Sequence, residues 1–188
     1  MLSREEITRY SRHLLLPEIA MQGQENLKEA KVLMIGAGGL GCPVLQYLAA
    51  AGVGTIGIVD FDVVDESNLQ RQILYTTVDV GKSKAELAAI KLTALNTLLH
   101  FKTYNTRISE ENVLDIIKDY DIVVDGSDNF PTRYLLNDAC VKLNKPLVSG
   151  SVLKIEGQTS VFNYKNGPTY RCLFPEPPAD CLNASRRF

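Results

Sequence analysis

The stretch KVLMIGAGGLGCPVLQYLAAAG, residues 31–52, decides the fold of this chain. It begins with a short apolar run (31–36) that ends in glycine, which is typical of a buried parallel strand. Four glycines lie in the turn that follows, in a GxGxxG pattern: Gly36, Gly38, Gly39 and Gly41. Such glycines let the backbone turn tightly and approach a phosphate at the amino end of a helix, here expected at 38–52. The stretch therefore predicts a strand–turn–helix unit that binds a nucleotide.

A second apolar run, TIGIVD at 55–60, ends in an acid. Asp60 follows Gly41 by nineteen positions (60 − 41), and units of this kind place the acid that holds the ribose hydroxyls roughly 20 residues after the glycines. The strand, the helix and the acid in register favour a nucleotide site over a glycine-rich turn without a ligand. Taken alone, Asp60 also fits the solvated end of a strand.

Strand and helix patterns alternate along most of the chain. Strands are expected at 101–108 and 121–128, and helices at 82–96, 109–120 and 129–144. Residues 146–164 indicate two strands joined by a turn, and residues 2–16 a helix with a capping box formed by Ser3 and Glu6. Ser109 is expected to cap its helix. The order predicts an α/β fold, a doubly wound, mostly parallel, Rossmann-like sheet with an N-terminal helical segment and an antiparallel extension.

Composition excludes several classes of protein. The 188 residues fit one domain, and 45% hydrophobic with 22% charged residues are typical of a soluble globular protein. No apolar run approaches the ~18 residues of a membrane span. A formal net charge of −2 and the lack of a basic run argue against nucleic-acid binding. The start of the chain lacks the features of a secretory signal, so we expect a cytoplasmic protein with reduced cysteines.

Three polar residues near the expected nucleotide site are not required for hydride transfer to a nicotinamide. Arg71 falls in the polar stretch DESNLQRQ (65–72), Lys84 begins the next helix, and Asp128 ends the strand DIVVDGSD. The carboxyl ends of parallel strands share one crevice, so all three can converge on a bound nucleotide. Two cations and a carboxylate that holds Mg²⁺ suit phosphoryl or nucleotidyl transfer. Singly, Arg71 also fits a surface residue and Lys84 an ion pair on a helix surface.

Five blocks of the sequence together resemble the ThiF/MoeB/HesA family, relatives of the adenylating half of ubiquitin-activating enzymes. They are RYSRH (9–13), GAGGLG (36–41), VDFDVVDESNLQRQ (59–72), VGKSK (80–84) and DGSDNFPTR (125–133). The resemblance runs from about residue 3 to about residue 180. The blocks NLQRQ and SDN are the most specific, because ordinary NAD enzymes lack them.

The resemblance implies an adenylyltransferase. Such proteins use MgATP to convert the C-terminal Gly-Gly carboxylate of a small ubiquitin-like sulfur carrier protein, of the ThiS or MoaD type, into an acyl-adenylate. Pyrophosphate is released, and the carrier serves sulfur transfer in thiamine or molybdopterin synthesis. The motifs quoted do not distinguish the two pathways.

The resemblance also implies roles for individual residues. Gly38 and its neighbours would bind phosphate, and Asp60 the ribose. Three polar residues would contact the phosphates: Asn68, Arg71 and Lys84. Asp128 would hold Mg²⁺. Arg12 matches an arginine that reaches into the ATP site of the partner subunit, which implies a homodimer with shared sites; by itself, Arg12 also fits a solvated helix residue.

The chain departs from the family in its last part. Relatives bind zinc through two CxxC pairs, but the first reads TYRC at 169–172 and the second would lie beyond Phe188. A tetrahedral site needs four protein ligands, so we predict no zinc, with Cys172 a remnant ligand. The crossover-loop cysteine of relatives aligns near Ala184, and Cys181 is the nearest thiol. A loop cysteine without a chemical role is the simpler interpretation of Cys181.

Residues 164–188 are expected to form an irregular crossover-loop region, since they hold four prolines and no clear periodicity. A compact domain rarely ends on such a loop. We therefore expect residues 1–188 to be a single ATP-binding adenylation domain that is truncated at its C-terminus.

Two other functions stay open. An NAD- or FAD-binding oxidoreductase is favoured by the glycine pattern and Asp60, but it gives no account of NLQRQ or Asp128. A non-catalytic nucleotide-binding remnant of the family is suggested by the unusual final residues.

Overall fold

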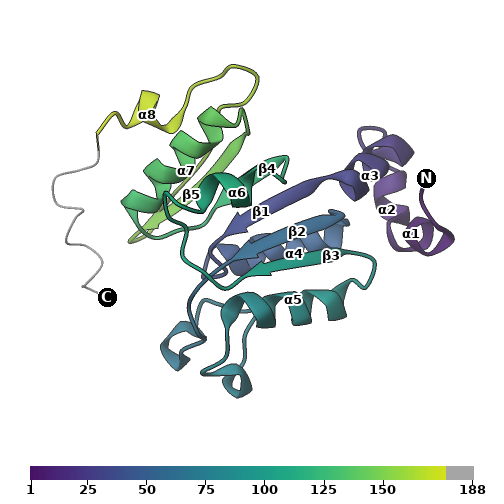
Figure 1. The fold of residues 1–188 in the computed structure, drawn as a ribbon. Helices are drawn as coiled ribbons and strands as arrows, with labels where there is room; N and C mark the ends of the chain where they lie inside the picture. The colour runs from purple at the N-terminus through teal and green to yellow at the C-terminus, as the bar shows by residue number, and fades with distance from the viewer. Residues whose placement is uncertain (177–188) are drawn as a thin grey trace.

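Six strands form one sheet in this computed structural model, which describes residues 1–176 (Figure 1). The order across the sheet is β3-β2-β1-β4-β5-β6. The strands are β1 (Lys31–Ile35), β2 (Thr55–Val59), β3 (His100–Tyr104), β4 (Ile122–Asp125), β5 (Leu147–Leu153) and β6 (Glu156–Phe162). The first five are parallel and β6 is antiparallel to β5. The predicted sheet and its antiparallel extension are confirmed.

Helices cover both faces of this sheet. They are α1 (Arg4–Arg9), α2 (Ser11–Leu14), α3 (Ala20–Glu29), α4 (Gly41–Ala51), α5 (Lys84–Leu95), α6 (Val113–Ile117), α7 (Phe130–Lys142) and α8 (Tyr170–Leu173), with 3-10 turns η1 (Glu66–Asn68) and η2 (Thr77–Asp79). Along β1, Val32 and Met34 join the core under α4 and α5. Leu33 joins the separate core under α6 and α7. Burial on both faces explains why β1 is a continuous apolar run.

The order of the strands creates a switch point beside β1. The chain winds from β1 to β2 and β3 on one side, and from β4 to β5 on the other. In sheets of this kind, ligands bind outside the carboxyl ends of the strands where the winding reverses. The glycine turn follows β1 and therefore lies at this point.

The N-terminal helices lie at the other end of the strands (Figure 1). Tyr10 packs against the last turn of α4, where a Cβ on Gly52 would be 2.5 Å from its ring. The Tyr10 hydroxyl also accepts a hydrogen bond from Asn96, just beyond α5. The segment formed by α1 and α2 is therefore fixed at the end of the sheet where the parallel strands begin, away from the glycine turn.

Some local predictions are wrong in detail. The capping box of Ser3 and Glu6 is confirmed, but α1 ends at Arg9 and α2 is a separate turn. The prediction of Ser109 as an N-cap is wrong. Its N–H donates to the side chain of Asn112, and α6 begins only at Val113. Helix α3, the short α8 within the expected irregular region, and the end of β3 at Tyr104 also differ from the predicted elements.

No helix within residues 1–176 has both the length and the apolar character to cross a membrane.

Candidate nucleotide site

The glycine turn (residues 36–41) combines two glycines that the backbone requires with two that leave space. Gly36 adopts a φ of 88°, and a Cβ on Gly41 would be 1.9 Å from the carbonyl oxygen of Gly36. By contrast, a Cβ on Gly38 or Gly39 would meet nothing closer than 3.5 Å. The turn is therefore packed against backbone at Gly41, whereas at its centre only side chains come within van der Waals distance of Gly38 and Gly39.

The polar segment 65–72 lies over Gly38 and Gly39, at the centre of the glycine turn. Asp65 accepts the N–H of Ser67 and begins η1, which turns the chain back towards β1. The aliphatic part of Arg71 then lies 3.5 Å from the Cβ position of Gly39, and the Gln72 amide nitrogen 3.5 Å from that of Gly38. The segment thus brings a cation and an amide onto the centre of the glycine turn.

Asp60 joins β2 to the glycine turn. One carboxylate oxygen accepts the N–H of Ala37 at 2.7 Å and the other accepts that of Asp62 at 2.8 Å. Asp60 is only 8% exposed, so it is not the solvated end of a strand. Burial raises the pKa of its carboxyl group, and the two backbone donors oppose this change. Each oxygen keeps a second acceptor position for a ligand hydroxyl.

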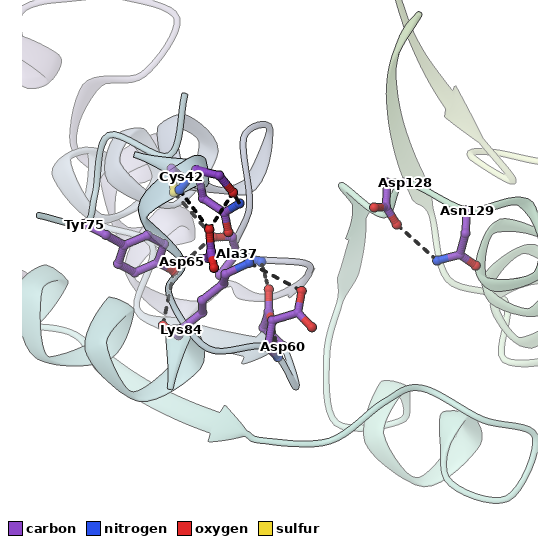
Figure 2. Close-up of polar contacts among 11 residues, drawn as sticks. Ala37, Cys42, Asp60, Asp65, Tyr75, Lys84, Asp128 and Asn129 are labelled. Atoms are coloured by element: carbon purple, nitrogen blue, oxygen red, sulfur yellow. Dashed lines mark hydrogen bonds and ion pairs between the residues drawn. The ribbon is translucent and has the colours of Figure 1, made fainter. Parts of the chain in front are cut away.

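Lys84 is buried at the first turn of α5, with 4% of its surface exposed. Its ammonium lies 3.4 Å from a carboxylate oxygen of Asp62, whose side chain is half exposed. The Tyr75 hydroxyl lies within hydrogen-bond distance of the carbonyl oxygens of both Ala37 and Lys84, which ties the start of α5 to the glycine turn (Figure 2). The alternative of a pair on a helix surface does not describe a buried lysine.

Asp128 lies apart from these residues. Figure 2 shows Asp128 and Asn129 on a different segment from Lys84 and Asp60, with no polar contact drawn between the two groups. The turn that carries Asp128 nevertheless touches the glycine turn, since a Cβ on Gly36 would be 3.1 Å from the carbonyl oxygen of Gly126. The glycine turn is therefore flanked by cations on the β2 side and by a carboxylate on the β4 side.

Two predicted residues are not brought to this centre in the single chain. Arg12 is exposed on α2, at the end of the sheet opposite to the glycine turn. Asn68 is half-buried in the polar segment, where its carbonyl oxygen accepts the N–H groups of Arg71 and Gln72. Asn68 thus shapes the segment that holds Arg71.

Three buried polar atoms in the described part of the chain have no hydrogen-bond partner: Gln72 Oε1, Asp125 Oδ2 and Ser127 Oγ. All three residues adjoin the glycine turn, Gln72 from one side and the pair around Gly126 from the other. Buried polar atoms are normally paired, so such atoms beside the glycine turn fit a bound water. These three residues were not predicted as site residues; the available signal in the sequence is the acid that ends β4, as Asp60 follows β2.

The cysteines of the described residues are free thiols. Cys42 and Cys140 are buried in the two cores. Cys172 is exposed, and hydrogen bonds from the Thr169 hydroxyl and backbone lower the pKa of its thiol. Residues 1–176 hold no group of three or more side chains that could bind a metal by themselves. Cys181 and Ala184 lie outside the described residues, and the absence of zinc stays a prediction.

The two kinds of glycine predict different effects of alanine. Gly41→Ala is expected to cost at least about 2 kcal/mol, since its Cβ would overlap backbone that cannot move easily, and to lower Tm by roughly 4–8 °C. Gly38→Ala should change Tm little, because its Cβ would only make ordinary contact with the Gln72 side chain, but it should weaken nucleotide binding by moving a bound phosphate away from the turn. Thermal unfolding and titration with ATP measure the two effects. Equal loss of stability in both variants would contradict the different packing of Gly38 and Gly41.

Comparison of the sequence with known proteins gives three likenesses. The model of the ThiF family matches residues 10–186. The chain is 56% identical over 182 residues to a probable adenylyltransferase/sulfurtransferase MoeZ of Mycobacterium tuberculosis, covering 94% of this chain and 46% of that protein. It is 55% identical over 181 residues to the sulfur carrier protein adenylyltransferase of Thermus thermophilus, covering 94% of this chain and 67% of that one.

Solved structures give the same picture of the fold. PaaA superposes with a TM-score of 0.81 and 28% identity, over 90% of this chain and 59% of that one. Escherichia coli MccB with ATP superposes with a TM-score of 0.78 and 27% identity, over 90% of this chain and 51% of that one. The chain spans about half the length of several proteins that it matches.

Proposed function

Because the chain belongs to the ThiF family, we propose that it is an adenylyltransferase that activates a small ubiquitin-like sulfur carrier protein with ATP. The observation that carries this proposal is the polar segment 65–72 lying over the glycine turn, with Arg71 against Gly39. The name of the Thermus relative, 55% identical, supports the choice of acceptor.

Several features of the site support a nucleoside triphosphate as the ligand. Gly38 and Gly39 carry no side chain beside the amino end of α4, which would let a phosphate approach the backbone. Asp60 would accept hydrogen bonds from the ribose hydroxyls. Arg71 and Lys84 offer positive charge on the same side of the turn. An oxidoreductase does not need these cations, and the relatives reported above are named adenylyltransferases.

In the proposed reaction, a carboxylate oxygen of the carrier's C-terminal glycine forms a bond to the α-phosphorus of ATP. The bond from that phosphorus to the oxygen bridging to the β-phosphate breaks, and pyrophosphate leaves with the electron pair. Arg71 and Lys84 would stabilise the negative charge that gathers on the phosphate oxygens. Asn68 would contact the phosphates only after its side chain turns towards the glycine turn, and it holds the segment that carries Arg71. Asp128 would hold Mg²⁺, which neutralises charge on the triphosphate.

The finer assignments belong to the same proposal. Residues 1–188 would act as one adenylation domain in a homodimer, with Arg12 contributed to the partner's site. The carrier would be of the ThiS or MoaD type and serve thiamine or molybdopterin synthesis. A cytoplasmic location agrees with the free thiols of Cys42, Cys140 and Cys172. No zinc is expected, since Thr169 stands where the first ligand would be.

Exchange of labelled pyrophosphate into ATP tests the proposal. We expect exchange that depends on a carrier ending in Gly-Gly, and none with the same carrier lacking its last two residues. ThiS- and MoaD-type carriers assayed side by side identify the pathway. Nucleotide binding without exchange by any carrier would favour the non-catalytic remnant instead.

A further inference from the structure

The turn between β4 and α7 (residues 126–129) is fixed by hydrogen bonds at both of its ends. The N–H of Gly126 donates to the carbonyl oxygen of Ile35 at 2.9 Å, which extends the pairing of β4 with β1 by one residue. The Asn129 side chain accepts the N–H of Thr132 at 3.0 Å and caps α7. Both ends of the turn are thus fixed to regular structure, and Ser127 and Asp128 lie between them.

Both backbone groups of Ser127 are held by side chains from neighbouring elements. Its N–H donates to Asp125 Oδ1 at 2.9 Å. Its carbonyl oxygen accepts a hydrogen bond from an Arg133 guanidinium nitrogen at 2.8 Å. That carbonyl belongs to the peptide unit that joins Ser127 to Asp128, so Arg133 fixes the plane from which the Asp128 backbone starts.

Burying the Asp125 carboxylate at this position costs free energy. The residue is 1% exposed at the end of β4, and the hydroxyl groups of Ser127 and Ser149 lie beside its carboxylate. An apolar residue would fill the same position in the core without that cost. Its contact with the N–H of Ser127 gives the acid a purpose, namely to hold the turn.

Arg133 is itself supported. Its guanidinium lies over the ring of Phe130, 5.8 Å from the ring centre, at the first turns of α7. The residue is half-buried. A guanidinium that is half-buried and hydrogen-bonded has few alternative positions, which makes it suitable for holding a carbonyl group.

The turn also contacts the glycine turn directly. A Cβ on Gly126 would be 2.6 Å from the terminal methyl group of Met34 and 3.5 Å from the Gly41 nitrogen. The glycine turn and the turn that carries Asp128 are therefore packed as one unit. A change in the second turn alters the distance from Asp128 to any phosphate bound at the first.

We propose that Arg133 and Asp125 are positioning residues that set the Asp128 carboxylate for a divalent cation on the bound triphosphate. The inference rests on the proposed function for the identity of the nucleotide. Neither residue is expected to touch the ligand. They act through the two peptide groups of Ser127.

The test measures how much Mg²⁺ strengthens binding of a non-hydrolysable ATP analogue, by titration in Mg²⁺ and in EDTA. Arg133→Met removes the donor to Ser127, and Arg133→Lys keeps one. Residues that orient a metal ligand typically contribute 10–100-fold to affinity. We therefore expect Arg133→Met to lose about 10–100-fold of the Mg²⁺-dependent gain, Arg133→Lys to recover part of it, and affinity in EDTA to stay unchanged.

Arg171→Met is the matched control. Arg171 of α8 makes an ion pair of 2.7 Å with Asp138. Asp138 lies on α7, as Arg133 does, but away from the turn. Its variant should keep the full gain from Mg²⁺, and Asp128→Asn should lose it.

Three outcomes would overturn the inference. They are a full Mg²⁺-dependent gain in Arg133→Met, an equal loss in Arg133→Met with and without metal, and a wild-type protein whose binding does not respond to Mg²⁺. Failure of pyrophosphate exchange with every carrier would count against the proposed function alone, because the binding titration does not need a carrier.

Discussion

Replacing Arg71 by alanine is expected to lower carrier-dependent pyrophosphate exchange by a factor of about 10²–10³, the usual effect of removing one fixed donor from a developing negative charge. The side chain lies along Gly39 of the glycine turn, where a phosphate would approach. The Arg71 guanidinium also donates a hydrogen bond of 3.3 Å to the carbonyl oxygen of Ser67 on an exposed turn. Little stability depends on that bond, so the loss should appear in kcat while Tm stays near the wild-type value.

Gln70→Ala is the matched control for this variant. The neighbouring Gln70 side chain is exposed and donates to the same carbonyl oxygen of Ser67 at 3.3 Å. The Gln70→Ala substitution therefore removes a comparable hydrogen bond within the polar segment but does not remove a charge. We expect Gln70→Ala to retain exchange within about twofold, as surface substitutions generally cost within ±0.5 kcal/mol. Near-wild-type exchange in Arg71→Ala, or equal losses in both variants, would contradict a direct role of Arg71.

The sheet and the glycine turn could be predicted because their signals are local. The apolar run of β1, the GxGxxG pattern and the acid after β2 each follow from a few neighbouring residues. The end of α4 is similar, since Gly52 adopts the left-handed φ of 87° that ends a helix. These features need no knowledge of the rest of the fold.

The N-terminal helices show where such reasoning fails. The periodicity of residues 2–16 favours one helix, yet the chain breaks at Tyr10, whose ring packs against Gly52. Helix α3 is polar, and its buried residue is Gln24, which donates to the carbonyl oxygen of Ala51 and contacts the His13 ring at 2.8 Å. A helix held by polar contacts with distant residues leaves no apolar pattern to detect.

The candidate site divides in the same way. Asp60, Arg71 and Lys84 could be selected from residue type and position, and the structure brings them to the glycine turn. Gln72 and Asp125 could not, because an unpaired buried atom is a property of packing. The separation of Asp128 from the cations likewise depends on β4 lying on the other side of β1 from β2.

The position of Arg12 leads to the second large effect. The glycine turn follows the carboxyl end of β1, whereas α2 lies at the amino-terminal edge of the sheet. The five residues of β1 alone separate these edges by roughly 17 Å, at about 3.4 Å per residue. Arg12 therefore cannot serve the site of its own chain without a rearrangement of α1 and α2. If it contributes to catalysis, it has to do so in the site of a second copy.

Mixing two inactive variants tests this directly. Arg12→Ala and Arg71→Ala are each expected to lose exchange by the factor of about 10²–10³ given above. In a two-fold dimer that shares its sites, a mixed pair holds one site with both arginines and one with neither. Random reassortment of equal amounts makes about half of the dimers mixed, so exchange should recover to about one quarter of the wild-type value.

The control pairs Arg12→Ala with the double variant that also carries Arg71→Ala. No combination of these chains holds both arginines in one site, so exchange should stay at the level of the single variants. Recovery in the first mixture and not in the second would require Arg12 to act across the dimer. A first mixture that stays inactive after mass spectrometry has verified subunit exchange would exclude a shared site, and wild-type exchange in Arg12→Ala alone would place Arg12 outside the active site. The exposed arginine on α2 would then be a solvated helix residue, and the site at the glycine turn would depend on the cations of its own chain.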